Sequence, residues 1–290
     1  MKWLLEKEFF WEENPDVVSP VLDKLGIEYV RARKTPFDDN WDDGCDFADI
    51  CVTEKNIISY GSLDFIKYVN NRTPWGDGAF LNLENMKCST YCNHYKEDLM
   101  NFPIHFVPIG LLRDNCRYYS DSVVEGGASK VFVRPDDGDK KFTGFTAYPE
   151  DIYETMTRMS YGTLKDNWMA VISSEKIIEE EFRFFATKNE IITGCTYKRK
   201  PYERGELRHE EIPEYPQEAY DLALKIASND WQPDLVYSVD IARQLGGYYL
   251  LEINSFASAG IYACDAEKLV KRVSELAEDK WNKENGADVI

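Results

Sequence analysis

The chain has 290 residues, with 34 Lys and Arg against 52 Asp and Glu, so its formal net charge is −18. Such a surface repels the phosphate backbone of nucleic acids and anionic lipid surfaces, which argues against general nucleic-acid binding and against docking on a membrane. A hydrophobic fraction of 43 %, with 14 % aromatic residues, is typical of a packed globular protein, and the length predicts about two domains.

The cysteines and the N-terminus bear on the cellular compartment. The seven cysteines are scattered, and the apolar start Met1–Leu5 gives way at once to charged residues, so no export signal is predicted. No run approaches the ~18 uninterrupted apolar residues of a membrane span. We therefore expect a reduced, cytoplasmic location and no membrane partner, while the oligomeric state stays unknown.

The first part of the chain alternates between strand and helix patterns. In chain order the expected elements are a strand at 3–10, a helix from about 14–16 to Gly26, a strand at 27–32, a polar loop at 35–46, and a strand and a helix within 49–69. The last helix should begin near Ser62. This alternation predicts a parallel or mixed sheet.

The middle and the end of the chain differ in character. Residues 70–120 are irregular, so we expect surface loops and short helices there. Further on, strands are expected at 129–135, 167–173, 180–187, 190–197, 234–242 and 247–254, and helices at 217–228 and 265–281. The strands that flank Lys188-Asn189 should form a hairpin, and the strands joined through 243–247 should pair antiparallel.

Two carboxylates and an amide form the clearest polar constellation. Glu252 and Asn254 project from the same face of a strand, because side chains on a strand repeat every two residues. Antiparallel pairing would bring Asp240, at the end of the preceding strand, beside them. Such an oxygen-only set suits Mg²⁺. The spacing alone fits equally well a solvent-facing edge hairpin.

A basic group lies upstream. An apolar strand ends in Arg134-Pro135 and runs into the loop 136–144, which contains Lys140 and Lys141. A strand arginine followed by two lysines could hold a triphosphate. By itself the segment is better interpreted as a charged hairpin turn, and it is not a Walker loop.

A third group lies on the predicted hairpin and just before it. Glu181 and Arg183 share one strand face, and a surface ion pair is the alternative interpretation. Upstream, an apolar strand opens into Ser173-Ser174-Glu175, where backbone groups could bind an adenine edge. Downstream, Tyr197-Lys198-Arg199-Lys200 gives another basic cluster, or a solvated hairpin end.

Taken together, the order of these motifs over roughly residues 125–265 resembles the ATP-grasp superfamily. The resemblance implies that Mg²⁺ and ATP are bound, and it assigns roles by position. Magnesium ligands would be Asp240, Glu252 and Asn254, and the nucleotide would be held by Arg134, Lys140, Lys141, Ile172, Ser173, Ser174, Glu175, Glu181, Arg183 and Lys198. Arg134 stands where most members have a lysine, and with the two lysines it is similar to a divergent clade of bacteria and phages.

The resemblance also implies a fold and an activity. We expect an α+β, ATP-grasp fold with two lobes that clasp ATP. A small α/β domain at 1–120 would precede the ATP-grasp domain at 121–290, whose lobes would span about 121–172 and 173–290. The implied activity is an ADP-forming carboxylate–amine ligase that works through an acyl-phosphate, with Arg183, Arg134 and Lys141 as catalytic residues.

The implied substrates are ATP, a small-molecule or peptide carboxylate, and an amine nucleophile. A kinase that phosphorylates a hydroxyl and a non-catalytic ATP-binding protein are the alternatives. The compartment would be the host cytoplasm if a phage encodes the chain.

Two weaker motifs favour structural interpretations. Cys88, Cys92 and His94 have zinc-like spacing without a second ligand pair, so a reduced loop is expected. Residues 75–78 are interpreted as a turn rather than a substrate loop.

Overall fold

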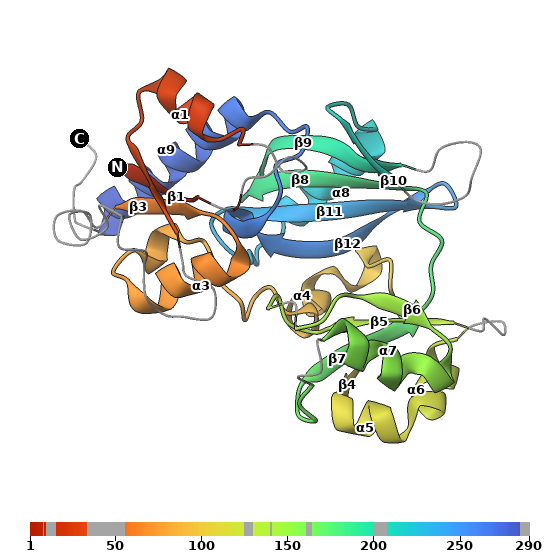
Figure 1. Cartoon of the computed structure of the whole chain (residues 1–290). Coiled ribbons are helices and arrows are strands. Elements are labelled where there is room, and N and C mark those ends of the chain that lie inside the picture. The colour runs from red at the N-terminus through yellow and green to blue at the C-terminus, as the bar shows by residue number, and fades with distance from the viewer. Residues whose placement is uncertain are drawn as a thin grey trace.

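A computed structural model describes residues 1–7, 9, 16–33, 56–124, 130–139, 141–160, 164–199 and 208–284. The predicted loop at 35–46 and the predicted site residues Lys140 and Lys200 lie outside these ranges. Strands of the described residues form three sheets, which Figure 1 shows as a small N-terminal sheet beside two larger sheets that lie one above the other.

The N-terminal sheet is parallel, as the alternation of strand and helix predicts. Its order is β2 (Tyr29–Ala32), β1 (Lys2–Glu6), β3 (Ile57–Tyr60), with α1 (Ser19–Leu25) and α3 (Leu63–Arg72) as the intervening and following helices. The Ser62 hydroxyl caps α3 by accepting the Phe65 N–H at 3.3 Å, so the predicted start of this helix is confirmed.

Helix α1 starts later than the sequence predicts. It begins at Ser19 rather than near residue 14, because the Asp16 carboxylate accepts the N–H groups of Val18 and Ser19 ahead of the first turn. Gly26 ends the helix in the left-handed conformation, with φ +64°, which glycine adopts without steric cost.

The second sheet is antiparallel. Its order is β4 (Ile104–Pro108), β7 (Met169–Ser174), β5 (Val131–Pro135), β6 (Phe145–Ala147). Helices α5 (Ile109–Asp114), α6 (Cys116–Val123) and α7 (Ile152–Met159) cover the face turned away from the third sheet (Figure 1).

The expectation of surface loops and short helices at 70–120 is wrong in two respects. Strand β4 lies there, and its partner β7 is more than 60 residues away, so a five-residue segment that ends in Pro108 carries little local signal. In addition, Trp75 and Tyr91 are buried, at 0 % and 1 % exposure, rather than on the surface.

The third sheet is also antiparallel and carries most of the predicted site. Its order is β10 (Arg208–Ile212), β9 (Glu190–Arg199), β8 (Glu180–Thr187), β11 (Tyr237–Gln244), β12 (Gly247–Ser255). Both hairpins are confirmed. Asn189, with φ +62°, turns the first, and Leu245-Gly246, with φ +50° and +77°, turns the second. Asp240 lies inside β11 rather than at its end.

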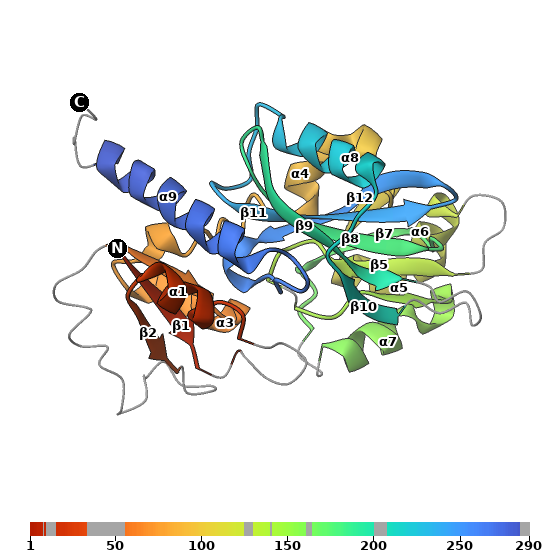
Figure 2. The same ribbon diagram turned by 90° about the horizontal axis from the view of Figure 1, so that it is seen from above.

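The remaining helices connect the units. Helix α8 (Gln217–Ala227) packs on the third sheet, and α4 (Cys88–Tyr95) lies between the two large sheets in Figure 1. Helix α9 (Ala266–Glu284) runs alongside α1 (Figure 2). Short 3₁₀ turns are η1 (Gly76–Gly78), η2 (Lys96–Asp98), η3 (Pro149–Asp151) and η4 (Phe256–Ser258).

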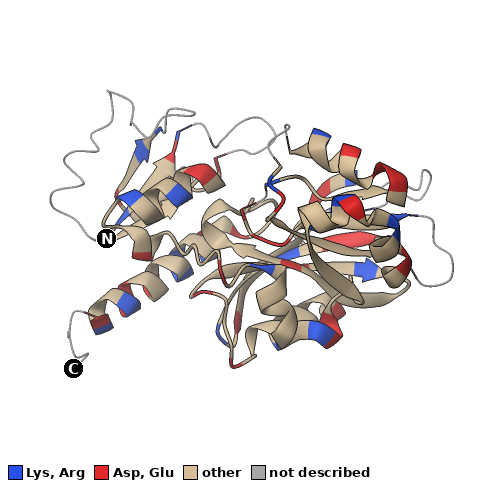
Figure 3. Ribbon diagram, turned by 90° about the horizontal axis from the view of Figure 1, so that it is seen from below, with Lys and Arg blue, Asp and Glu red and all other residues tan. Residues whose placement is uncertain are grey.

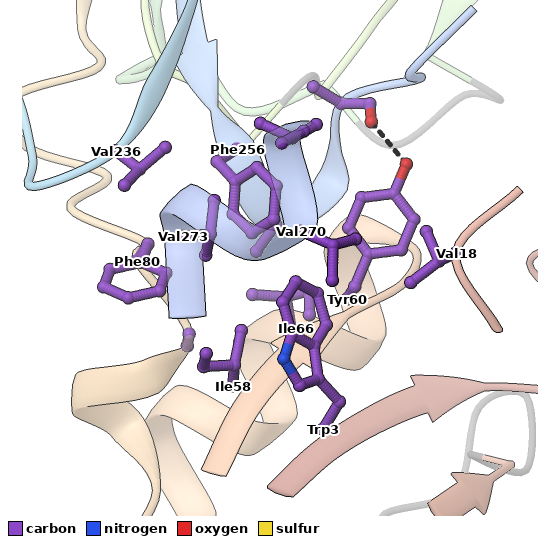
Figure 4. Packing of buried hydrophobic residues seen from close by; sticks show 14 of the residues in the cluster. Trp3, Val18, Ile58, Tyr60, Ile66, Phe80, Val236, Phe256, Val270 and Val273 are labelled. Carbon is purple, nitrogen blue, oxygen red and sulfur yellow. Dashed lines mark hydrogen bonds between the residues drawn. The ribbon is translucent and has the colours of Figure 1, made fainter. Parts of the chain in front are cut away.

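A hydrophobic core joins the N-terminal sheet to the end of the third sheet (Figure 4). Phe256 is at its centre, with ring centroids 6.2 Å from Trp3 and 5.7 Å from Tyr60. The Tyr60 hydroxyl donates a hydrogen bond to the Ala259 carbonyl oxygen at 2.7 Å, and the Gly61 N–H donates to the Ala257 carbonyl oxygen at 2.9 Å. The segment after β12 is therefore fixed against β3.

The expected domain boundary between residues 120 and 121 stays a prediction. It falls within α6, and β4 ahead of it pairs with β7 behind it. Acidic and basic residues alternate along α9, as the red and blue segments of its ribbon in Figure 3 show. Among the described residues, no helix has both the length and the apolar character needed to cross a bilayer.

Candidate functional site

Two neighbouring cavities lie along β12, the first between this strand and β5 of the second sheet. The first, which we call the Arg134 cavity, has a volume of about 220 Å³ and lies under the loop that follows β5. The second, the Arg183 cavity, has a volume of about 230 Å³ and lies at the end of β12. Both are lined by Met86, Gly138 and Asn254, so they meet at these residues.

Arg134 reaches from β5 toward β12. Its Nη1 lies 3.5 Å from Glu252 Oε2, and its Nη2 donates to the Tyr91 hydroxyl. Burial acts to lower the pKa of Arg134, but Tyr91, Cys88 and Glu252 together outweigh this effect and raise that pKa well above its ordinary value. A guanidinium held charged at the cavity wall can bind an anion such as a phosphate.

Glu252 and Asn254 line the same cavity, as the two-residue spacing predicts. The Asn254 amide nitrogen donates to Glu252 Oε1 at 2.9 Å. Together the two side chains offer carboxylate and amide oxygens, which are ligands that Mg²⁺ accepts. No group of three or more His, Cys, Asp and Glu side chains in the described part of the chain has metal-binding geometry.

Asp240 is close to these residues but is engaged elsewhere. It is opposite both Arg183 on β8 and Glu252 on β12. Both carboxylate oxygens accept hydrogen bonds from Arg183, from Nε at 2.8 Å and from Nη2 at 2.7 Å. Asp240 is completely buried and is absent from the described linings of both cavities. Burial raises its pKa, while the arginine counteracts that rise.

Arg183 is the centre of a buried polar cluster. Besides the two bonds to Asp240, its Nη1 donates to the Gly260 carbonyl oxygen at 3.2 Å. The guanidinium carbon lies 5.1 Å from the Tyr197 ring centroid and 4.8 Å from that of Tyr262. These rings stack on each other at 5.0 Å and 4°. Contacts from β11, from β9 and from the segment after η4 therefore fix the position of this arginine at the wall of its cavity.

Glu181 and Lys198 pair with each other beside this cluster. The lysine Nζ lies 2.9 Å from Glu181 Oε2, and the Tyr197 hydroxyl donates to the same oxygen at 2.5 Å. The alternative interpretation of Glu181 and Arg183 as a surface ion pair is therefore wrong. Both side chains are buried, and each is bonded to another residue. Neither Glu181 nor Lys198 lines a cavity among the described residues.

The remaining predicted nucleotide residues in the described part of the chain line neither of the two cavities. Lys141 pairs with Asp137, and its Nζ lies 4.9 Å from the Trp168 ring centroid. It lines neither cavity. Ile172, Ser173 and Ser174 are buried in β7, and Glu175 follows them. Their contact with a nucleotide stays a prediction.

Several residues that line the cavities or contact their arginines were not singled out from the sequence. Phe132 is two residues before Arg134 and so shares its strand face, a signal that the alternation of side chains does provide. Tyr91 and Tyr262 come from distant segments, and only the tertiary fold brings them to the arginines. Tyr262 has φ +52°, a conformation that the sequence does not signal for a tyrosine.

The weaker motifs have structural positions. Cys88, Cys92 and His94 belong to helix α4 rather than to a loop, and the His94 ring stacks on Trp231 with centroids 4.2 Å apart. Residues 76–78 form η1, a tight turn as expected. In this turn a Cβ on Gly78 would lie 1.7 Å from the Ile57 carbonyl oxygen, so close packing requires glycine.

Comparison with known proteins identifies the family. Residues 116–272, more than half of the chain, match the family described as ATP-grasp domain, R2K clade family 2. The chain therefore belongs to the ATP-grasp superfamily, and its α+β fold is the ATP-grasp fold, as the order of the motifs predicts. A search of the curated proteins finds no match.

Solved structures share the fold along nearly the whole chain. A D-alanine–D-alanine ligase from Bacillus anthracis complexed with ATP has a TM-score of 0.60 at 14 % identity, covering 98 % of this chain and 99 % of that one. D-alanyl-alanine synthetase A from Vibrio cholerae has 0.58 at 12 %, covering 96 % and 99 %. A RimK domain ATP-grasp protein from Sphaerobacter thermophilus has 0.56 at 10 %, covering 96 % and 98 %. At such identities the likeness concerns the fold.

Proposed function

We propose that this protein is an ATP-dependent carboxylate–amine ligase that releases ADP and phosphate. The observation that carries the proposal is the pair of cavities that meet at Asn254. One contains a charged guanidinium beside the oxygen ligands Glu252 and Asn254, and the other contains the guanidinium of Arg183. A triphosphate in the first cavity and a carboxylate in the second would place the reacting atoms side by side.

The reaction has two displacement steps. A carboxylate oxygen attacks the γ-phosphorus of ATP, the bond to the β,γ-bridging oxygen breaks, and ADP leaves. The nitrogen of an amine then attacks the acyl carbon, the carbon–oxygen bond to the phosphoryl group breaks, and phosphate leaves while the amine loses a proton. Arg134 and Arg183 would stabilise negative charge on the transferred phosphoryl group, so that positioning and electrostatics supply most of the catalysis.

The residues of the Arg134 cavity fit a magnesium ion. Glu252 and Asn254 would hold it through oxygen atoms, and bound Mg²⁺ would supply neutralisation of phosphate charge. We propose Asp240 as a third magnesium ligand. In the structure its carboxylate forms an ion pair with Arg183 through two hydrogen bonds. We assign the 136–144 loop, with Lys141 and Lys140, to covering the phosphates, and residues 172–175 to the adenine.

Isothermal titration and ADP release test the proposal. Glu252→Gln should weaken Mg²⁺-dependent ATP binding and lower ADP release by about two orders of magnitude, because one phosphate-neutralising ligand is lost. Glu218→Gln, on the exposed face of α8, is the matched control and should behave as wild type. Unchanged binding and turnover in Glu252→Gln would contradict this assignment of the site.

The product distinguishes the alternatives. A ligase yields an amide and free phosphate only when both a carboxylate and an amine are present. A kinase would yield a stable phosphate ester without any amine, and a non-catalytic protein would bind ATP without releasing ADP in any substrate mixture. Either of these two results would overturn the ligase proposal.

A further inference from the structure

The Arg183 cavity has two chemically different walls. One wall consists of four apolar side chains, from the start of α3 and from the segment between η1 and α4: Leu63, Leu81, Leu83 and Met86. The other part of the lining, which we call the polar wall, carries polar groups from β8, β12 and the segment after it: Arg183, Asn254, Ser255, Ser258, Gly260 and Tyr262. Of the described residues in this lining, Arg183 alone is ionised. The cavity is therefore amphipathic.

The apolar wall is held rigidly. The Ser255 hydroxyl donates to the Phe80 carbonyl oxygen at 2.8 Å, and the Asn82 N–H donates to the Asp234 carboxylate at 3.0 Å. The Asn85 amide nitrogen donates to the Pro233 carbonyl oxygen at 2.9 Å. The segment that carries Leu81, Leu83 and Met86 is thus tied to the end of β12 and to the segment that precedes β11. A wall fixed in this way needs little ordering when a ligand binds.

The polar wall is equally well fixed. The aromatic pair Tyr197 and Tyr262 flanks Arg183, and three of the five N–H donors of this arginine already bond to Asp240 and to the Gly260 carbonyl oxygen. The Tyr60 hydroxyl holds the neighbouring Ala259 carbonyl. Arg183 can therefore orient a carboxylate without moving, and Asn254, which lines the same cavity, also lines the Arg134 cavity.

From these walls we propose that the carboxylate substrate is a small monocarboxylic acid with an apolar chain, an inference that rests on the ligase function proposed above. The carboxylate lies toward Arg183 and Asn254, and the apolar chain lies against Leu63, Leu81, Leu83 and Met86. A volume of about 230 Å³ is below the ~300–1,000 Å³ of pockets for drug-sized ligands, so the acid, or the part of it that enters, is small.

A pair of matched acids tests the chain preference. Isocaproate and succinate share the same carboxylate and two methylenes, but isocaproate ends in an isopropyl group where succinate has a second carboxylate. Each buried CH₂ contributes about fourfold in affinity, and isocaproate has four more carbons than acetate, so burial of its chain favours isocaproate over acetate by about 200-fold in kcat/KM. Succinate should be used less well than acetate, because its second carboxylate would be desolvated against the leucines.

A variant locates the effect in this wall. Leu83→Ala should lower kcat/KM for isocaproate on the order of tenfold and weaken isocaproate binding measured by calorimetry, while ATP binding stays unchanged. Leu111→Ala, at a half-exposed position on α5, is the control and should match wild type.

The outcomes separate this proposal from the ligase function. If succinate supports ADP release as well as isocaproate does, or if Leu83→Ala leaves the isocaproate preference unchanged, the apolar-acid proposal is overturned while the ligase function stands. If no carboxylate with any amine supports ADP release, the ligase function itself fails. A preference for isocaproate that Leu83→Ala removes supports the proposal.

Discussion

Replacing Asp240 with asparagine tests the buried ion pair on which the position of Arg183 depends. Arg183 is 6 % exposed and Asp240 is completely buried, and two hydrogen bonds of 2.8 and 2.7 Å join them. Asparagine keeps the shape but removes the charge, so a guanidinium is left buried without its counter-ion. Removing one partner of a buried pair costs about 3–5 kcal/mol. At about 2 °C per kcal/mol for a protein of this size, Tm should fall by roughly 6–10 °C.

Thermal and urea unfolding of metal-free protein, followed by circular dichroism, measure this loss. In a double-mutant cycle, Asp240→Asn and Arg183→Met should couple by about 2–3 kcal/mol, because the double variant leaves neither charge uncompensated. Asp230→Asn is the control, since this carboxylate is fully exposed beside Lys188, and it should leave Tm unchanged.

The metal-free condition makes the test decisive about the role of Asp240. If this residue served only as a metal ligand, its neutralisation without metal would relieve repulsion from Glu252 and Glu181, which act on Asp240 in the folded protein. Stability would then stay the same or rise. Such a result, or effects of the two substitutions that add within about 0.5 kcal/mol, would refute the ion-pair account.

Three further predictions concern packing and reactivity. Phe256→Ala should lower the free energy of unfolding by about 3–5 kcal/mol, since the ring is 1 % exposed at the centre of the core, and a loss below about 1 kcal/mol in urea titrations would contradict this. Gly194→Ala would place a Cβ 2.3 Å from the Phe184 ring, so it should destabilise by about 1–3 kcal/mol, and adding Phe184→Leu should restore part of the loss. Burial raises the pKa of Cys92 to about 11, so its thiolate is scarce at neutral pH. Its alkylation rate, followed by mass spectrometry, should therefore rise about tenfold per unit between pH 8 and pH 10, whereas a plateau near pH 9 would mean an ordinary thiol.

Helices and strands were predictable wherever the local sequence alone determines the secondary structure. Residues 180–187 and 190–197 are rich in β-branched and aromatic residues and flank a two-residue turn, so both the strands and their pairing follow from the sequence. Strand β4 was missed because its five residues become a strand by pairing with β7, a long-range contact that has no local signature.

The site was predictable in composition but not in its pairings. The spacing of Glu252 and Asn254 placed them on one strand face, and the structure brings them to one cavity with Arg134. The pairing of Asp240 with Arg183 depends on the register between β11 and β8. The two residues are 57 positions apart in the sequence, so no local pattern indicates this register. The flanking tyrosine at 262 depends on a positive φ that no sequence rule assigns to tyrosine.

The central claim is that the protein binds its substrates in the two cavities and forms an amide from a carboxylate and an amine while it converts ATP to ADP and phosphate. The most direct test measures ADP, free phosphate and amide in one reaction that contains Mg²⁺, ATP, isocaproate and a panel of amines, for wild type and for Arg134→Met. We predict equal amounts of ADP, phosphate and amide for wild type, and a loss of all three in the variant. ADP released without any amide, or product formation that persists in Arg134→Met, would contradict the account.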